Sequence, residues 1–140
     1  MTDAVAELVA VMRRQRAKDP WKQAQTHRSL ARYLLEETHE LLEAIEAIDR
    51  GDSAESWDHL REELGDLLLQ VVFHAVIAEE AGVFDLDEVA RGITEKLIRR
   101  NPHIDADAEV LSIEEVDAQW QRIKAAEKGR TSPEEGIPPT

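Results

Sequence analysis

The sequence has no cysteine, which excludes a disulfide framework and any metal site built on thiolates. Glycine and proline are scarce, with 6 and 5 of 140 residues, and only 4% of the residues are aromatic. No apolar run reaches the roughly 18 residues that a membrane-spanning helix needs. Basic residues are too few to balance the acidic ones, and the formal net charge is −13. This charge argues against nucleic-acid polymers or membranes as partners.

What the sequence does contain in abundance is Ala, Leu, Glu and Arg, residues that favour helices. A chain of this length is about the size of one domain, and one core buries roughly 70% of the unfolded surface. The N-terminal residues show no pattern of a secretion signal. We therefore expect a cytoplasmic all-α protein with one domain over residues 1–129. Residues 130–140 are polar and rich in proline, and we expect them to form a disordered tail.

Apolar periodicity and capping signals predict five helices, over about residues 3–17, 26–49, 53–81, 85–100 and 112–128. Asp19-Pro20 ends the first one, because proline disfavours helical conformation at the residue before it. Gly51-Asp52 marks a turn between the two longest helices. We predict that these two form an antiparallel hairpin on which a helical bundle is built.

Acidic residues interrupt the apolar faces of both long helices. On a helical wheel of about 100° per residue, Glu37 falls inside the apolar arc of the first long helix and Glu40 at its edge. The second long helix is apolar nearly all round over Leu64–Ile77. Its one polar stripe consists of Glu63, Asp66, Gln70 and His74. An isolated buried carboxylate is very costly, so such groups should be paired or bound to a metal.

The two acidic pairs, Glu37/Glu40 and Glu63/Asp66, also lie at matching distances along the predicted hairpin. Glu40 and Glu63 are equally distant from the predicted turn, and so are Glu37 and Asp66. In an antiparallel helical hairpin, residues equidistant from the turn lie side by side. Hard oxygen ligands with no Cys or His among them suit Mg²⁺, with Mn²⁺ as a substitute, better than Zn²⁺. We therefore predict that these four carboxylates bind magnesium.

The acids allow two other interpretations. A single pair of acids three residues apart is most often solvated surface. A di-iron bundle needs Glu-x-x-His on two helices. Glu36 and His39 supply one such pair, but His39 lies on the outward face, and the second long helix has no histidine at the required place.

The segments EETHE (Glu36–Glu40) and ELGD (Glu63–Asp66) together resemble the EExxE…ExxD signature of MazG-type nucleotide pyrophosphohydrolases. The stretches DPWKQAQTH, KLIRRNPH and WQRIKAAEK are also similar to that family. The resemblance implies an all-α, dimeric or higher-order enzyme that uses Mg²⁺ to hydrolyse nucleoside triphosphates to the monophosphate and pyrophosphate. It also implies that the four acids are metal ligands, and that Glu36 supports them or acts as general base.

Several cations and aromatic residues are candidates for holding the nucleotide. Lys96 and Arg100 are four residues apart near a predicted helix end, where cations also complement the helix dipole. Trp120 and Lys124 have the same spacing in the last helix, and a lone Trp there is usually core. The family resemblance favours nucleotide contacts for both pairs. Further candidates are Arg61, for a phosphate or an acid, and Trp21, for a base or for anchoring the first helix.

We expect water to attack the α-phosphorus with Glu36 or one of the four acids as base, and pyrophosphate to leave. One alternative is a relative of narrower specificity, either dUTPase-like or a phosphoribosyl-ATP pyrophosphohydrolase. Another is a non-catalytic acidic helical module that dimerises. The segment Leu64–Ile77 is apolar on more faces than one partner helix can cover, so we expect a homo-oligomer, either a dimer or a tetramer.

Overall fold

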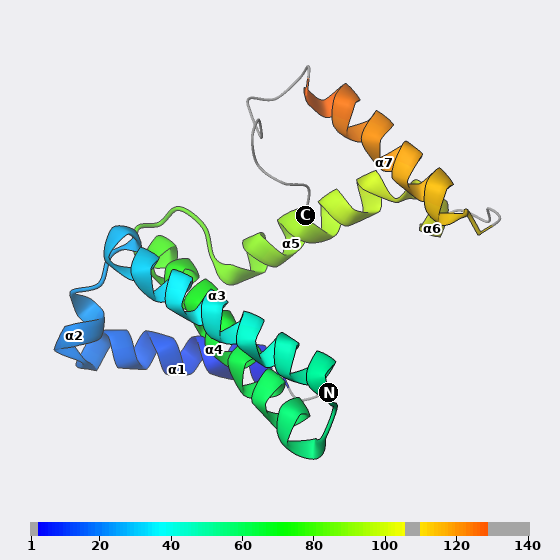
Figure 1. Cartoon of the computed structure of the whole chain (residues 1–140). Helices are drawn as coiled ribbons and strands as arrows, with labels where there is room; N and C mark the ends of the chain where they lie inside the picture. Colours follow the sequence, from blue (N-terminus) through cyan, green and yellow to red (C-terminus); the bar gives the residue numbers. More distant parts are fainter. Residues whose placement is uncertain (1–2, 106–109, 129–140) are drawn as a thin grey trace. The chain divides into compact units, whose positions relative to one another are not determined.

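All the regular structure in the described part of the chain is helical (Figure 1). The structure, a computed structural model, describes residues 3–105 and 110–128. Its helices are α1 (Ala4–Lys18), α2 (Pro20–Gln23), α3 (His27–Arg50), α4 (Ala54–Glu80), α5 (Leu86–Arg100), α6 (Pro102–Asp105) and α7 (Ile113–Lys128). The all-α prediction is confirmed. The predicted disordered tail lies outside the described residues. Within them, no helix is both long enough and apolar enough to cross a bilayer.

The short helices α2 and α6 were not predicted, and each starts at a proline, Pro20 and Pro102. Proline is well suited to the first helical position, since its missing N–H would have no partner there. The Asp19 side chain also caps α2, accepting from the backbone N–H groups of Trp21 at 2.8 Å and Lys22 at 3.3 Å. The proline that ends α1 therefore also begins α2.

Capping boxes set the starts of the long helices. Thr26 and Ser29 exchange side-chain and backbone hydrogen bonds of 2.8 and 3.0 Å at the start of α3. Ser53 and Ser56 do the same at the start of α4, with distances of 2.8 and 3.1 Å. Each box satisfies two backbone donors that the first helical turn leaves free.

The described residues fall into two compact units, divided between Val89 and Ala90. In the first, α3 and α4 pack along each other and run in opposite directions, joined by the short segment 51–53 (Figure 1). Helix α1 packs against α4. The core where these helices meet is largely aliphatic and consists of Val9, Met12, Leu30, Val72, Phe73 and Val76.

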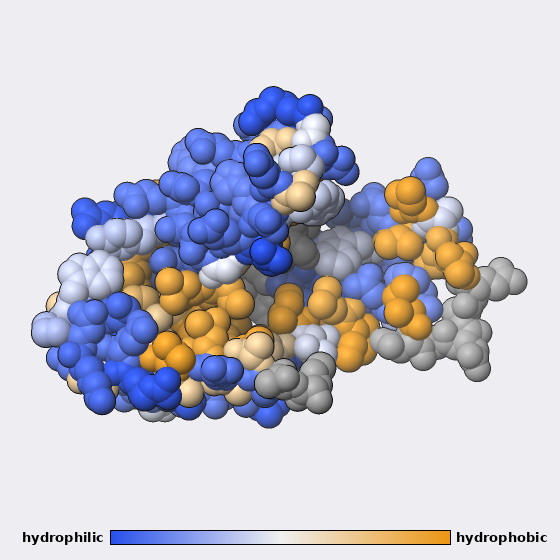
Figure 2. Space-filling model, turned by 90° about the horizontal axis from the view of Figure 1, so that it is seen from below, coloured by the Kyte–Doolittle hydropathy of each residue, from blue (hydrophilic) through white to orange (hydrophobic). Residues whose placement is uncertain are grey.

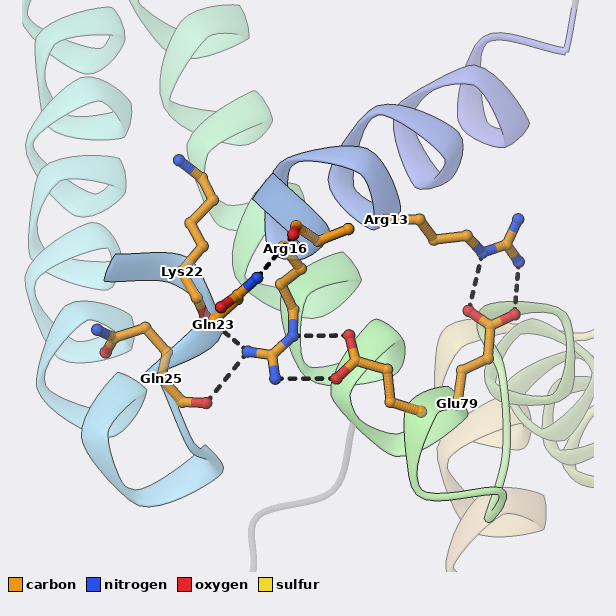
Figure 3. Close-up of polar contacts among 8 residues, drawn as sticks. Arg13, Arg16, Lys22, Gln23, Gln25 and Glu79 are labelled. Carbon is orange, nitrogen blue, oxygen red and sulfur yellow. Dashed lines mark hydrogen bonds and ion pairs between the residues drawn. The ribbon is translucent and has the colours of Figure 1, made fainter. Parts of the chain in front are cut away.

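Two arginines fasten α1 to the last turn of α4 (Figure 3). Arg13 donates from Nε and Nη2 to the two carboxylate oxygens of Glu79, at 2.9 and 2.6 Å. Arg16 donates in the same way to Glu80, at 2.7 and 2.9 Å. Both pairs have the bidentate geometry that makes arginine–carboxylate contacts specific.

The two pairs differ in burial and in what else they hold. The side chain of Arg16 is only 11% exposed, against 53% for Arg13. The Arg16 guanidinium also donates to the backbone carbonyls of Lys22 at 2.7 Å and Gln25 at 3.1 Å, and its Cζ lies 6.0 Å from the ring centroid of Phe73. Arg16 therefore ties α1, the α2 segment and α4 together (Figure 3).

In the second unit, α7 is tied to α5 by one carboxylate. Glu127 accepts from Arg99 Nε at 2.7 Å and from Arg100 Nη2 at 3.1 Å. Arg100 is buried, and its Cζ lies 5.3 Å from the ring centroid of Trp120. Hydrogen bonding by Arg99, and then by Arg100, lowers the pKa of Glu127 from 4.5 to about 2, against the opposing effect of burial.

We expect Arg16→Ala to lower the free energy of unfolding by about 1–3 kcal/mol, because it removes charged hydrogen bonds from a largely buried site. Arg13→Ala is the matched control in the same helix, and an exposed pair of this kind contributes at most about 1 kcal/mol. Urea unfolding of the two variants measures the difference. Equal losses in both would contradict the assignment of Arg16 as the central fastening residue.

A second prediction concerns acid stability. Because the folded state lowers the pKa of Glu127, this group stabilises the fold fully above about pH 4.5 and loses that contribution as the pH falls toward about 2. The gap in unfolding free energy between wild type and Glu127→Gln should therefore narrow over this range. Trp120 fluorescence, with Trp21 and Trp57 changed to Phe, reports the unfolding. Exposed Asp117→Asn is the control, and a pH-independent gap for Glu127→Gln would contradict the prediction.

Candidate metal centre

Three of the four predicted metal ligands come together in the first unit. Glu37 projects from α3, while Glu63 and Asp66 project from α4, one helical turn apart. Each offers a carboxylate oxygen, and these three atoms lie within 4.8 Å of one another. Glu63 is buried and the other two are half-buried. The opposite directions of α3 and α4 bring the two helices' acids to one level.

Glu40, the fourth predicted ligand, is exposed and lies outside this group of three. It is nevertheless close enough for its charge to act on the others. Burial raises the pKa of Glu37, and the charges of Asp66, Glu40 and Glu63 raise it further. Burial likewise raises the pKa of Glu63, followed by the charges of Glu40 and Asp66. The four carboxylates therefore repel one another, as like charges in one site do.

The bonding of Glu63 fits a cation. Its Oε2 atom is buried and has no hydrogen-bond partner, whereas Oε1 lies 3.5 Å from Nε2 of His59. A buried carboxylate oxygen without a partner is costly, and a metal ion relieves that cost. The donor atoms of the group are all carboxylate oxygens, which suit hard divalent ions such as Mg²⁺ or Mn²⁺.

Sequence reasoning missed His59. It precedes Glu63 by four residues on α4, so the two side chains are neighbours on one helix face. That spacing was the available signal. Glu36, the predicted base, is an exposed neighbour of Glu37, and its charge makes a small contribution to the raised pKa of that group. Its catalytic role stays a prediction.

The polar stripe of α4 continues beyond the acids through Gln70 and His74. Gln70 is buried, 7% exposed, and its Oε1 atom has no hydrogen-bond partner. His74 pairs with His27 of α3, with 2.7 Å between their Nδ1 atoms and nearly parallel rings. Burial and the charge of His27 lower the pKa of His74. The sequence marked the stripe but gave no reason to pair these two histidines.

The predicted nucleotide contacts have varied environments. In the first unit, Trp21 is 50% exposed and meets the Tyr33 ring edge-on at 5.8 Å, while Arg61 is exposed and pairs with Asp58 at 3.0 Å. In the second unit, Lys96 and Lys124 are half-buried. Arg100 and Trp120 contact each other in the Glu127 cluster described above. The binding roles of all six residues remain predictions.

Comparison with known proteins places this arrangement among known folds and sequences. The family model described as the MazG nucleotide pyrophosphohydrolase domain matches residues 25–105. The structure is similar to that of a mazG-related protein from Thermotoga maritima, with a TM-score of 0.68 and 27% identity over 86% of this chain and 98% of that one.

Curated relatives include the nucleoside triphosphate pyrophosphohydrolase/pyrophosphatase MazG of Thermotoga maritima, 48% identical over 126 residues, which are 89% of this chain and 45% of the relative. The nucleoside triphosphate pyrophosphohydrolase of Escherichia coli K12 is 42% identical over 129 residues, which are 90% of this chain and 46% of the relative. The chain thus spans about half the length of these relatives.

Titration with a divalent ion tests the carboxylate group. We expect millimolar Mg²⁺ or Mn²⁺ to raise the melting temperature, because an ion that binds only the folded state stabilises it. Binding below neutral pH should also release protons, since carboxylates whose pKa is raised are partly protonated before the ion arrives. Calorimetry in two buffers of different ionisation enthalpy counts them.

Glu63→Gln should abolish both the thermal shift and the proton release. Glu46→Gln, an exposed acid of α3, is the control and should behave as wild type. A thermal shift that survives in Glu63→Gln would place the binding ion elsewhere.

Proposed function

The chain belongs to the MazG nucleotide pyrophosphohydrolase family, and from this premise we propose that it hydrolyses nucleoside triphosphates, ribo or deoxyribo, to the monophosphate and pyrophosphate. The observation that carries the proposal is the group of three carboxylates between α3 and α4, with a buried Glu63 oxygen that has no protein partner. Relatives 42–48% identical to this chain are named nucleoside triphosphate pyrophosphohydrolases, which supports the same reaction.

We propose Glu37, Glu40, Glu63 and Asp66 as the residues that hold Mg²⁺, for which Mn²⁺ can substitute. Bound there, the ion supplies charge neutralisation to the triphosphate and acidifies water. Glu40 is outside the group of three but acts on the pKa values of Glu37 and Glu63, which supports its inclusion. His59, 3.5 Å from Glu63 Oε1, orients that carboxylate so that Oε2 is left for the ion.

The protein's own groups then have separate tasks. A carboxylate accepts the proton of the attacking water, and Glu36, exposed and adjacent to Glu37, is the candidate base. Water attacks the α-phosphorus, the bond to the bridging oxygen breaks, and pyrophosphate leaves. Cations are needed to meet its charge in a protein with a net charge of −13.

For these contacts we propose the residues singled out from the sequence, namely Lys96, Arg100, Lys124 and Arg61 for phosphate and Trp120 and Trp21 for the base. A phosphate at Arg100 has to compete with Glu127, which accepts from that guanidinium at 3.1 Å. A phosphate at Arg61 competes only with an exposed pair to Asp58, which is weak.

We propose further that residues 1–129 act as one catalytic domain and that the chain forms a homo-oligomer, a dimer or a tetramer. Apolar side chains lie open on the face seen in Figure 2, bordered by hydrophilic ones. The exposed apolar residues of α3 and α4 include Leu34, Leu35, Leu42, Ile45, Leu64, Leu68 and Val71, at 39–68% exposure. Such a surface supports burial against a second copy.

Substitution of the carboxylates tests the activity. We expect Glu37→Gln and Asp66→Asn to lower kcat/KM for Mg²⁺-dependent pyrophosphate release by at least about a hundredfold, since even residues that only support metal ligands account for 10–100-fold. Glu46→Gln should retain wild-type activity. A screen of ribo- and deoxyribonucleoside triphosphates gives the substrate range, and circular dichroism checks that helicity is unchanged. Full activity in Glu37→Gln and Asp66→Asn would overturn the site assignment.

A further inference from the structure

Gln70 stands out among the described residues because its amide is buried without being satisfied. Only 7% of the residue is exposed, and its Oε1 atom has no hydrogen-bond partner. The same is true of only one other side-chain oxygen in the described part of the chain, Oε2 of Glu63. Buried polar groups in proteins are nearly always hydrogen-bonded, so each exception requires an explanation.

The two unsatisfied oxygens lie on the same face of α4. Residues seven apart are two helical turns apart and nearly in line, so Gln70 follows Glu63 along the helix with Asp66 between them. For Glu63 the explanation is the cation of the candidate metal centre. Gln70 lies about 6 Å farther along the helix axis than Asp66, at 1.5 Å per residue.

The polar side chains next to Gln70 make their hydrogen bonds elsewhere. His74, the next residue of the stripe, pairs with His27 at 2.7 Å. Tyr33 precedes Glu37 by four residues on α3, and Gln70 follows Asp66 by four residues on α4. Because the two helices run in opposite directions and Glu37 lies level with Asp66, Tyr33 lies level with Gln70. The Tyr33 hydroxyl accepts from Arg32 Nη2 at 2.9 Å. Within the described residues no group donates to Gln70 Oε1, so a ligand group that donates a hydrogen bond fits this atom.

The chemistry of the substrate identifies such a group. With the triphosphate at the carboxylates, the sugar is the next part of the nucleotide, since its 5′ oxygen is bonded to the α-phosphorus. Its hydroxyl groups lie a few bonds further on, comparable with the spacing from Asp66 to Gln70. We propose, on the basis of the proposed function, that Gln70 is a specificity-determining residue that accepts a hydrogen bond from a sugar hydroxyl of the nucleotide.

An unsatisfied amide kept for a ligand destabilises the free protein, a usual trade-off between stability and function. Replacing it by a side chain of similar shape without polar atoms should therefore have two opposite effects. Stability without nucleotide should rise, and discrimination between sugars should fall. An amide that merely packs in the core could show the rise in stability, but its replacement would leave the discrimination between sugars unchanged.

The experiment compares wild type, Gln70→Met and the control Gln15→Met, an exposed glutamine of α1. The probes are ribo-, 2′-deoxyribo- and 2′,3′-dideoxyribonucleoside triphosphates of adenine and cytosine. Their methylene analogues, with carbon in place of the α,β-bridging oxygen, are not cleaved at that bond. Calorimetry with the analogues in Mg²⁺ gives Kd, and pyrophosphate release from the natural triphosphates gives kcat/KM.

We expect wild type and Gln15→Met to bind the dideoxy analogue about tenfold more weakly than the analogue that carries the recognised hydroxyl, the worth of one hydrogen bond of this kind. In Gln70→Met the ratio of these two dissociation constants should fall to about one. If Gln70→Met loses the difference in Kd between the ribo and deoxyribo analogues, the contact is to the 2′-hydroxyl. If it loses the difference in Kd between the deoxyribo and dideoxyribo analogues, the contact is to the 3′-hydroxyl. Free Gln70→Met should melt about 2–8 °C higher than wild type.

Unchanged sugar discrimination in Gln70→Met would overturn the proposal, and so would a lowered melting temperature with discrimination intact. The two proposals can fail separately. If wild type and Gln70→Met both hydrolyse triphosphates and discriminate between sugars equally, this inference is refuted and the proposed pyrophosphohydrolase activity is not. Analogue binding that depends on Gln70, without hydrolysis of any triphosphate, supports this inference and refutes the activity. The absence of all nucleotide binding refutes both.

Discussion

Mutual repulsion between carboxylates held at one level of α3 and α4 is the constraint on which the rest of the structure depends. Burial and neighbouring charge raise the pKa values of Glu37 and Glu63, so the helix pair is packed around groups that resist being brought together. Such an arrangement persists only when other contacts hold the helices in place. The buried Glu63 oxygen without a hydrogen-bond partner is the atom at which we propose that a cation binds.

The contacts that hold the helices are placed away from the acids. Capping boxes begin α3 and α4, and the aliphatic core joins both to α1 at the far end from their connecting turn. There Arg16 bridges three segments through one guanidinium, in a site that is largely closed to water. Charge of opposite sign is thus paired where stability is needed, and charge of one sign is gathered where a metal and a triphosphate are expected to bind. Gln70, further along α4, also has an oxygen without a hydrogen-bond partner, which we propose meets the nucleotide.

Much of the first unit could be predicted from the sequence because its signals are local or periodic. The wheel placed Glu37 inward, the stripe on α4 marked Glu63, Asp66 and Gln70, and equal distances from Gly51-Asp52 aligned the acids of the two helices. Partners distant in the sequence left no such signal. Nothing in the spacing indicated the stacking of His27 on His74, or that Arg100 would be buried between Glu127 and Trp120.

The sequence by itself determined that the chain is helical, where its long helices begin and end, and which acids lie at the same distance from the turn between them. It could do so because helix propensity, capping and helical period act over a few residues, and because a single turn relates the two helices. Only the tertiary structure decided which of those acids converge within 4.8 Å, which oxygens are left without partners, and which arginines are already engaged. Those properties depend on side-chain rotamers and on burial against distant segments. Both are settled when the helices pack and not before.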